Sequence, residues 1–382
     1  MFTHTSPNPS PPSSTLLSVG LALSVSLAAL STAHAASFDC AKATSAAEKI
    51  ICATPALSSL DEELAKAYKT LREELDPKGQ ALLKESQKRW LRYWPVICSE
   101  DPTKLKSATQ DPVCIQELYL ERLKVLTLDR DRLKGVMGGL SLYQLTFDSA
   151  NTPHPDLSEV TFRPFVNHDI SFPQLVTKNL TGEALALAQV VNVWLSPSKE
   201  ELKMLGDRES ETSVQSALSV ITPRLWHAAV TSNFMGLGAA HPFDTSSNKH
   251  FLVAHKRALT AADVFAKQGW AAELARLTQQ AIKAQLNAEE LDTGASDLKE
   301  LERLAQRPES WRFTARGLVV EFNIYEIAPY ASGPQEVSLA WAALEPLLAP
   351  SFKEELKLIK LIKLTQPTQP TQPTQGERSP TP

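Results

Sequence analysis

The chain has 382 residues, of which 43% are hydrophobic, so it can bury sizeable cores and is predicted to be globular. Domains of about 100 to 200 residues are usual, so this length predicts two or three modules. The chain carries 39 Lys and Arg against 43 Asp and Glu, a formal net charge of -4. No global basic field exists, which argues against nucleic acid as a partner.

An apolar segment near the N-terminus predicts export. Residues 16–30 are uncharged and have the length of a signal-peptide core, and Ala33-His34-Ala35 has the small-x-small pattern that signal peptidase reads. We therefore expect a signal peptide over residues 1–36 and a periplasmic or secreted protein, although no Lys or Arg precedes the apolar run. The alternative is a membrane-spanning helix, which needs about 20 apolar residues and fits this Ser-containing run less well.

Four cysteines are clustered in the chain behind this segment, at Cys40, Cys52, Cys98 and Cys114. An even number of clustered cysteines in an exported protein is typical of two disulfides, for which three pairings are possible. A zinc site is the alternative, but the spacing contains no C-x-x-C pair. We therefore expect no metal and no other cofactor.

The segment after Cys40 has a helical pattern up to about residue 129. Two pairs with capping-box spacing, Ser45 with Glu48 and Ser59 with Glu62, predict helix starts. Apolar residues at three- and four-residue spacing follow, with a break at residues 76–79 and an expected end at Pro95. The pattern predicts a small helical N-terminal domain over residues 37–130, with a modest core that disulfides would stabilise.

Residues 140–350 have a different pattern, which follows a glycine-rich boundary near residues 135–139. Strands are expected at 140–147, 160–165, 189–195, 225–234 and within 311–327 around an Arg316-Gly317 turn, and a helix at 259–285. Because these strands do not alternate regularly with helices, we predict an α+β domain with an antiparallel sheet.

The C-terminal end is of low complexity. Residues 365–374 repeat Thr-Gln-Pro, which predicts an extended, disordered tail over residues 365–382. Just before it, residues 357–364 alternate Lys with Leu and Ile. We favour a helix end or strand packed on the domain over a segment that touches a membrane or another chain, so membrane contact is not expected.

The sequence motifs of common enzymes are absent. The chain contains no G-x-S-x-G, H-E-x-x-H or G-x-x-x-x-G-K, and Gly236-Leu237-Gly238 lacks the third glycine of a dinucleotide site. The histidines of the second region are spread without ligand spacing. We therefore predict a binding protein rather than an enzyme, with a hydrolase as the least favoured class.

Two stretches of the second region are suited to recognition. Residues 236–243 place small residues beside His241 and Pro242, and residues 325–334 hold two Tyr, two Pro and a Gly. Tyrosine offers a large, stiff contact area with a polar tip, and proline lowers the cost of ordering a loop. The alternative is that these aromatic rings close the edge of the core.

The helical region resembles the N-terminal domain of LprI-type lysozyme inhibitors. The matching elements are Phe38 to Ala43, Ala47 to Cys52, Leu57 to Asp61, Tyr68, Gln87, Trp90, Cys98, Cys114 and Tyr119 to Leu123. They cover nearly the whole region. One departure is Trp94-Pro95-Val96-Ile97, where the family usually has a basic-acidic pair, and it concerns the local helix geometry.

Residues 140–348 resemble the C-terminal domain of RsiV-like proteins, found in a lysozyme-sensing anti-sigma factor and in some peptidoglycan deacetylases. The matching elements are residues 170–175, 238–242, 259–265 and 317–333. Neither a sigma-binding segment nor a deacetylase domain is expected here, so those activities are not carried over.

Both resemblances imply a link to lysozyme. We therefore predict an exported, non-catalytic protein of the cell envelope that binds and inhibits lysozyme or a related muramidase, which requires only that it fill and block the enzyme's cleft. The candidate lysozyme-binding residues are Tyr325, Pro329, Tyr330, Gly333 and His241. The rival hypothesis is a periplasmic module that binds peptidoglycan or another envelope protein and does not affect lysozyme.

Overall fold

The computed structural model describes residues 36–105, 107–128, 140–157, 164–285 and 297–362. Residues 1–35 of the expected signal peptide (1–36), the glycine-rich boundary and the Thr-Gln-Pro tail lie outside these residues. Within the described ranges, no helix is long and apolar enough to cross a membrane.

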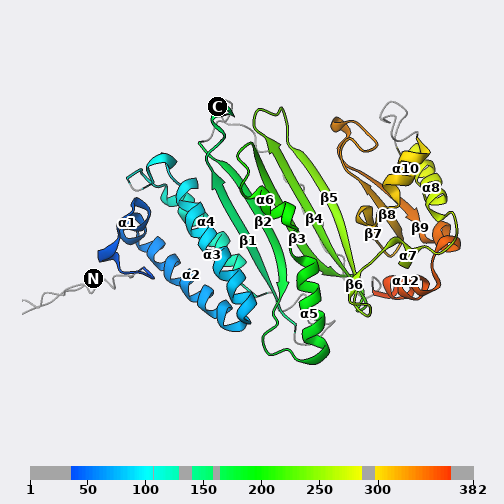
Figure 1. Ribbon diagram of the computed structural model, residues 1–382, viewed down its shortest axis with the longest axis horizontal. Coiled ribbons are helices and arrows are strands. Elements are labelled where there is room, and N and C mark those ends of the chain that lie inside the picture. The colour runs from blue at the N-terminus through cyan, green and yellow to red at the C-terminus, as the bar shows by residue number, and fades with distance from the viewer. Residues whose placement is uncertain (1–35, 106, 129–139, 158–163, 286–296, 363–382) are drawn as a thin grey trace, which may run out of the picture. The chain divides into compact units, whose positions relative to one another are not determined.

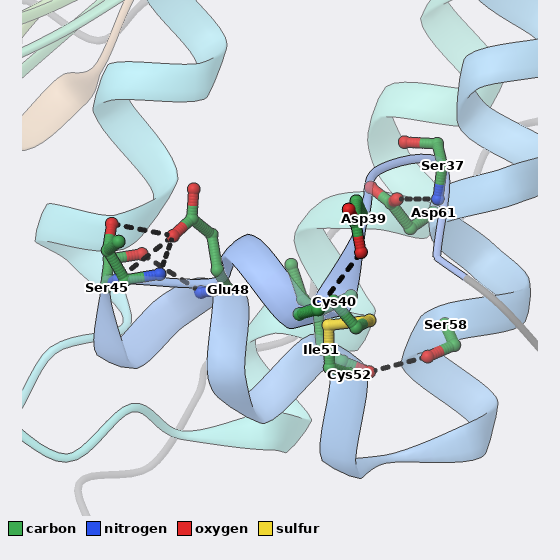
Figure 2. Close-up of a disulfide and its surroundings, with 11 residues drawn as sticks. Ser37, Asp39, Cys40, Ser45, Glu48, Ile51, Cys52, Ser58 and Asp61 are labelled. Atoms are coloured by element: carbon green, nitrogen blue, oxygen red, sulfur yellow. Dashed lines mark hydrogen bonds between the residues drawn. A yellow bond between two sulfur atoms is a disulfide. The ribbon is translucent and has the colours of Figure 1, made fainter.

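The N-terminal region is helical, as predicted (Figure 1). Its helices are α1 (Ala46–Ala53), α2 (Pro55–Glu74), α3 (Pro77–Ile97) and α4 (Pro112–Val125). Two disulfides join Cys40 to Cys52 and Cys98 to Cys114, which confirms the prediction of two bridges and selects one of the three pairings. The first bridge ties the short 3-10 turn at residues 40–42 to the end of α1 (Figure 2).

Of the helix boundaries predicted from local signals in this region, one is confirmed and two are wrong. Ser45 and Glu48 form the predicted capping box at α1, with each side chain accepting from the other residue's backbone N–H (Figure 2). The predicted start at Ser59 is wrong, because Pro55 already occupies the first turn of α2 and Ser59 lies inside the helix. The predicted end at Pro95 is also wrong, since α3 runs on to Ile97 and tolerates the proline in its last turn.

A six-stranded sheet follows, with its strands in sequence order (Figure 1). The strands are β1 (Leu142–Asn151), β2 (Val166–Leu175), β3 (Ser210–Val220), β4 (Leu225–Gly236), β5 (Phe243–Leu252) and β6 (Arg257–Ala258). All neighbours are antiparallel except β2 and β3, which are parallel. Helices α5 (Gly182–Leu195) and α6 (Lys199–Met204) lie between these two strands in the chain, as a parallel connection requires.

The structure confirms the strands expected at 140–147 and 225–234 and corrects the one expected at 189–195. Residues 189–195 belong to α5 and are not a strand: its buried residues Leu187, Val191 and Leu195 are four apart, the spacing of a helix face. The strand expected at 160–165 falls largely outside the described residues, and β2 begins at Val166.

A second sheet has three antiparallel strands, β7 (Trp311–Phe313), β8 (Gly317–Phe322) and β9 (Gln335–Ala340), and confirms the strands expected around Gly317. Its helices are α7 (Ala261–Val264), α8 (Trp270–Gln285), α10 (Leu298–Ala305), α11 (Trp341–Leu344) and α12 (Pro350–Ile362). The mixed α+β class with antiparallel sheets is therefore confirmed.

Of the two C-terminal segments predicted to be helical or packed, one is interrupted and one is confirmed. The helix expected over 259–285 is interrupted after α7, because Phe265 pairs with Leu348 in an isolated bridge and Gly269 has a φ of 75°. Residues 357–362 belong to α12, whose Phe352, Leu356 and Ile359 are buried, as the favoured packed arrangement predicts.

The helical region shares a core with the six-stranded sheet. One cluster of buried residues joins Leu83 and Trp90 of α3 to Leu145 and Phe147 of β1 and Phe172 of β2. A second cluster lies between β7, β8, β9 and the C-terminal helices, and a third lies under α5. The apolar faces of the helical region are thus not self-contained, because α3 packs along the edge strand β1 (Figure 1).

Candidate functional site

The two predicted tyrosines lie beside His241, although this histidine is more than 80 positions away from them in the sequence. The rings of His241 and Tyr330 stack with their centroids 3.8 Å apart, and the Tyr330 hydroxyl donates a hydrogen bond of 3.2 Å to the carbonyl oxygen of Pro242. Tyr325 completes the group, with its hydroxyl 3.5 Å from His241 Nε2 and its ring 5.7 Å from that of Tyr330. We call Tyr325, Tyr330, His241 and Phe243 the aromatic cluster.

The loop after β8 holds these tyrosines on a stiff base. Asn323 accepts a hydrogen bond from the backbone N–H of Ser246 and donates to its carbonyl oxygen, which ties the loop to β5. Glu326 accepts from the backbone N–H of Asn323 and pairs with Arg307 at 2.7 Å. Ile327 is fully buried between these anchors. The loop base is therefore fixed by polar contacts on both sides and by the core below.

The rest of the loop has the backbone of a tight turn. Gly333 has a φ of 66° and its N–H donates to the carbonyl oxygen of Tyr330, while Pro329 precedes the short 3-10 turn Tyr330–Ser332 and is exposed. Tyr325 also has a positive φ, of 67°, which is uncommon for a non-glycine residue and is found at functional turns.

The tips of the aromatic cluster are open to solvent. The Tyr325 residue is 51% exposed, His241 is exposed, and neither tyrosine belongs to the hydrophobic core that Ile327 joins. Phe243 is 39% exposed, and its ring lies parallel to that of Tyr325. Phe234, the register partner of Phe243 on β4, is 44% exposed.

Phe243 ends the predicted stretch 236–243 but was not among the candidate contact residues, and Phe234 lies outside both predicted stretches. Two exposed phenylalanines directly opposite each other on neighbouring strands form an apolar patch, and exposure of such a patch to water is unfavourable. Phe243 could have been selected from the sequence, because it directly follows His241 and Pro242 in the chain. Phe234 could not be selected without the pairing of β4 and β5.

The helical region holds a buried polar centre. Asp61 on α2 accepts hydrogen bonds from the Tyr119 hydroxyl, at 3.1 Å, and from the backbone N–H of Ser37, at 2.7 Å (Figure 2). Tyr119 packs edge-on against Trp90 and Trp94, and burial beside Asp61 raises the pKa of its hydroxyl well above the usual range. This centre is too deeply buried to bind a partner, and it orients α2, α3 and α4.

Two parts of the chain match known protein families. Residues 40–126 match the family "Lysozyme inhibitor LprI". This LprI-like region spans α1 to α4 and both disulfides, as the sequence resemblance predicted. Residues 262–342 match the family DUF3298, described as a protein of unknown function, which is consistent with the RsiV-like resemblance. Neither family description points to catalysis, and a comparison with curated proteins found no match.

Two solved structures are similar to parts of the chain. One is a member of the DUF3298 family from Bacteroides fragilis, with 15% identity, a TM-score of 0.45, and coverage of 58% of this chain and 98% of that chain. The other is a DUF3298 family protein from Pseudomonas aeruginosa, with 17% identity, a TM-score of 0.37, and coverage of 55% and 94%.

The DUF3298 match includes the tyrosines of the aromatic cluster but not His241 and Phe243, which belong to the six-stranded sheet region. The cluster is therefore built by two parts of the chain. Among the described residues, no group of three or more His, Cys, Asp or Glu side chains is placed to hold a metal ion.

Proposed function

We propose that this protein is exported and that it binds and inhibits lysozyme or a related muramidase. The observation that carries the proposal is the match of residues 40–126 to an inhibitor family, in a region closed by two disulfides. Disulfides of this kind form in oxidising compartments, which supports a periplasmic or secreted location. Lysozyme acts in the same envelope.

The aromatic cluster is the proposed contact surface. Stiff aromatic side chains with polar tips lose little entropy on binding and are enriched among residues that dominate interfaces. The hydroxyl of Tyr325 and the imidazole of His241 could donate hydrogen bonds to the carboxylates of a muramidase cleft, which need only be occupied for inhibition. The phenylalanines beside them would add apolar contact area.

The test is a direct inhibition assay. Purified mature protein, with both disulfides intact, is titrated into several lysozymes, and the rate of cell-wall lysis and the binding affinity are measured in parallel. We expect lysis by at least one lysozyme to slow in proportion to the fraction of enzyme bound. Binding to insoluble peptidoglycan with no effect on any lysozyme would instead favour the rival function in the envelope.

A further inference from the structure

Two cavities lie on one face of the six-stranded sheet and share Gln215. The first, of about 320 Å³, lies between β1, β2 and β3 and the helices α3 and α4 of the LprI-like region. The second, of about 400 Å³, lies over β3, β4 and β5 and is bounded by Asn323 and Pro334 of the DUF3298 region. We call the surface formed by the two cavities together the polar groove.

The floor of the polar groove follows from strand register. Because side chains alternate between faces, residues paired across neighbouring strands point to the same side of the sheet. Two rows of paired residues cross β1 to β5 in this way, and all of them line the cavities. One row is Asp148, Asp169, Ser213, Asn233 and Asp244, and the other is Thr146, Ser171, Gln215, Thr231 and Ser246.

Every side chain in these two rows can form hydrogen bonds, and several are already oriented by their neighbours. Ser213 donates to Asp169 at 3.0 Å, Asn233 donates to Asp244 at 2.6 Å, and the hydroxyls of Thr146 and Ser171 lie 3.2 Å apart. Such bonds fix the side chains and leave further acceptor positions on each oxygen. The floor is therefore a preorganised polar surface.

Polar groups at the LprI-like end lack partners. Arg122 is 2% exposed, lies over the Trp90 ring, and bonds Gln87 and Ser86, but its Nη1 has no hydrogen-bond partner among the described residues. The same holds for Oδ2 of Asp148. Burial raises the pKa of Asp148 to about 6 despite the nearby charge of Arg122.

The chemistry of the groove selects its occupant. The carboxylates Asp148, Asp169, Asp244 and Glu121 outnumber the single cation Arg122 along its lining, which disfavours nucleic acid and other polyanions. No large apolar side chain stands in either floor row, which disfavours an amphipathic helix. The carboxylate, hydroxyl and amide groups of the two rows match a ligand that presents hydroxyls and acetamido groups along its length.

The extent of the floor sets the size of the ligand. Neighbouring strands lie about 4.8 Å apart, so the four gaps between β1 and β5 span about 19 Å. A surface of that length contacts several units of a polymer at once. We propose that the polar groove binds an uncharged glycan chain of N-acetylated amino sugars, at a site separate from the aromatic cluster.

Two variants test the position of the site. Gln215 and Thr231 are exposed, and no hydrogen bond joins either side chain to another described residue, so Gln215→Arg and Thr231→Arg should fold normally and obstruct the middle of the floor. Gln189→Arg on α5 is the matched control, because Gln189 is also an exposed glutamine and lines a different cavity. Thermal melts verify the fold of each variant.

The probe is chitohexaose, the hexamer of N-acetylglucosamine, titrated into the full mature chain by calorimetry with lysozyme absent. We expect binding by the natural sequence and by Gln189→Arg, and a loss of at least about tenfold in affinity in both groove variants. Tyr330→Ala should bind the hexamer normally, which separates this site from the proposed lysozyme contact.

Three results would overturn the proposal. The first is a dissociation constant weaker than about 1 mM for the natural sequence. The second is equal affinity in folded groove variants, which would place the sugar elsewhere. The third is binding of hexalysine in place of chitohexaose with the same sensitivity to Gln215→Arg, which would make the groove a site for cationic peptides.

Discussion

The sequence alone presented two alternative roles for Tyr330, recognition of a partner and closure of the edge of the core. The structure gives it features of both. Its hydroxyl reaches Pro242 and its ring stacks on His241, so it connects the loop after β8 to the turn before β5. It is nevertheless only partly buried and lies outside the hydrophobic core. A residue held in this way is preorganised for contact without being necessary for the fold.

Tyr330→Ala is therefore expected to weaken lysozyme binding about thirtyfold, because an anchor at an interface centre contributes about 2 kcal/mol. The melting temperature should change little, since a half-exposed hydrogen bond contributes only about 1 kcal/mol. Titration with lysozyme beside a thermal melt measures both effects, and Tyr330→Phe separates the ring from the hydroxyl. Unchanged affinity in a stably folded Tyr330→Ala protein would remove this loop from the binding site.

Asp148 provides a second prediction, which concerns pH. Its folded-state pKa of about 6 is above the ordinary value of 3.8, chiefly because of burial, so the native state holds this proton more tightly than the unfolded state. Stability from this group is present below pH 3.8 and is lost as the pH rises through about 6.

Asp148→Asn should abolish this loss, because asparagine does not titrate. The difference in free energy of unfolding between the variant and the natural sequence should change by up to a few kcal/mol from pH 4 to pH 6 and be constant above. Urea denaturation at several pH values measures it. The lowered pKa values of His168, His227 and His250 act in both proteins and cancel in the difference. Parallel stability curves would show that Asp148 titrates normally.

At the scale of elements, sequence periodicity identified the helices and several strands, and failed where local preference and tertiary context disagree. Residues 189–195 contain Val190, Val191 and Val193, which favour strands, yet the four-residue spacing of the buried side chains makes them part of α5. Strands β3 and β5 were missed because polar residues occupy the face that forms the polar groove, Ser213 and Gln215 on β3 and Asp244 and Ser246 on β5, which leaves little apolar alternation.

The aromatic cluster and the polar groove could likewise be predicted from the sequence only in part. The tyrosine loop and His241 could each be selected from their composition, because glycine, proline and tyrosine carry local information about turns and contact surfaces. Their contact with each other depends on the packing of β5 against the loop after β8, which no local pattern encodes. The polar groove depends on the register of five strands, and a shift of one residue in any of them would turn its side chains to the opposite face.

Gly317 provides a sharp test of the packing of the second sheet. A Cβ added at this first residue of β8 would lie 2.8 Å from the carbonyl carbon of Leu339 on β9, which is rigid backbone. Gly317→Ala must therefore separate the two strands, and we expect a loss of at least about 3 kcal/mol in the free energy of unfolding. Gly206→Ala is the control, because its added Cβ would make only ordinary contact, at 3.5 Å from Lys203. Chemical denaturation of both variants measures the difference, and equal stability would contradict the tight pairing of β8 with β9.

At the scale of the whole molecule, the LprI-like region is both closed by its own disulfides and joined to the sheet. Trp90, Trp94 and Tyr119 pack within it, and both bridges are internal to it. Its α3 also contacts β1: Ser86 donates a hydrogen bond of 2.7 Å to the carbonyl oxygen of Thr146, and the Arg89 guanidinium lies 5.8 Å from the centre of the Phe147 ring. Separating the region from the sheet would expose this face.

A fragment of residues 36–126, produced in an oxidising compartment, should fold on its own, because its bridges and aromatic packing are retained. It should melt cooperatively with a helical circular-dichroism spectrum, at a lower temperature than the full chain, since the core shared with Leu145, Phe147 and Phe172 is lost. The exposed face of α3 should also make it associate, which gel filtration at increasing concentration would detect. A disordered spectrum would show that the sheet is required for folding of the region, whereas a monomer that melts at the temperature of the full chain would show that the shared core contributes nothing to its stability.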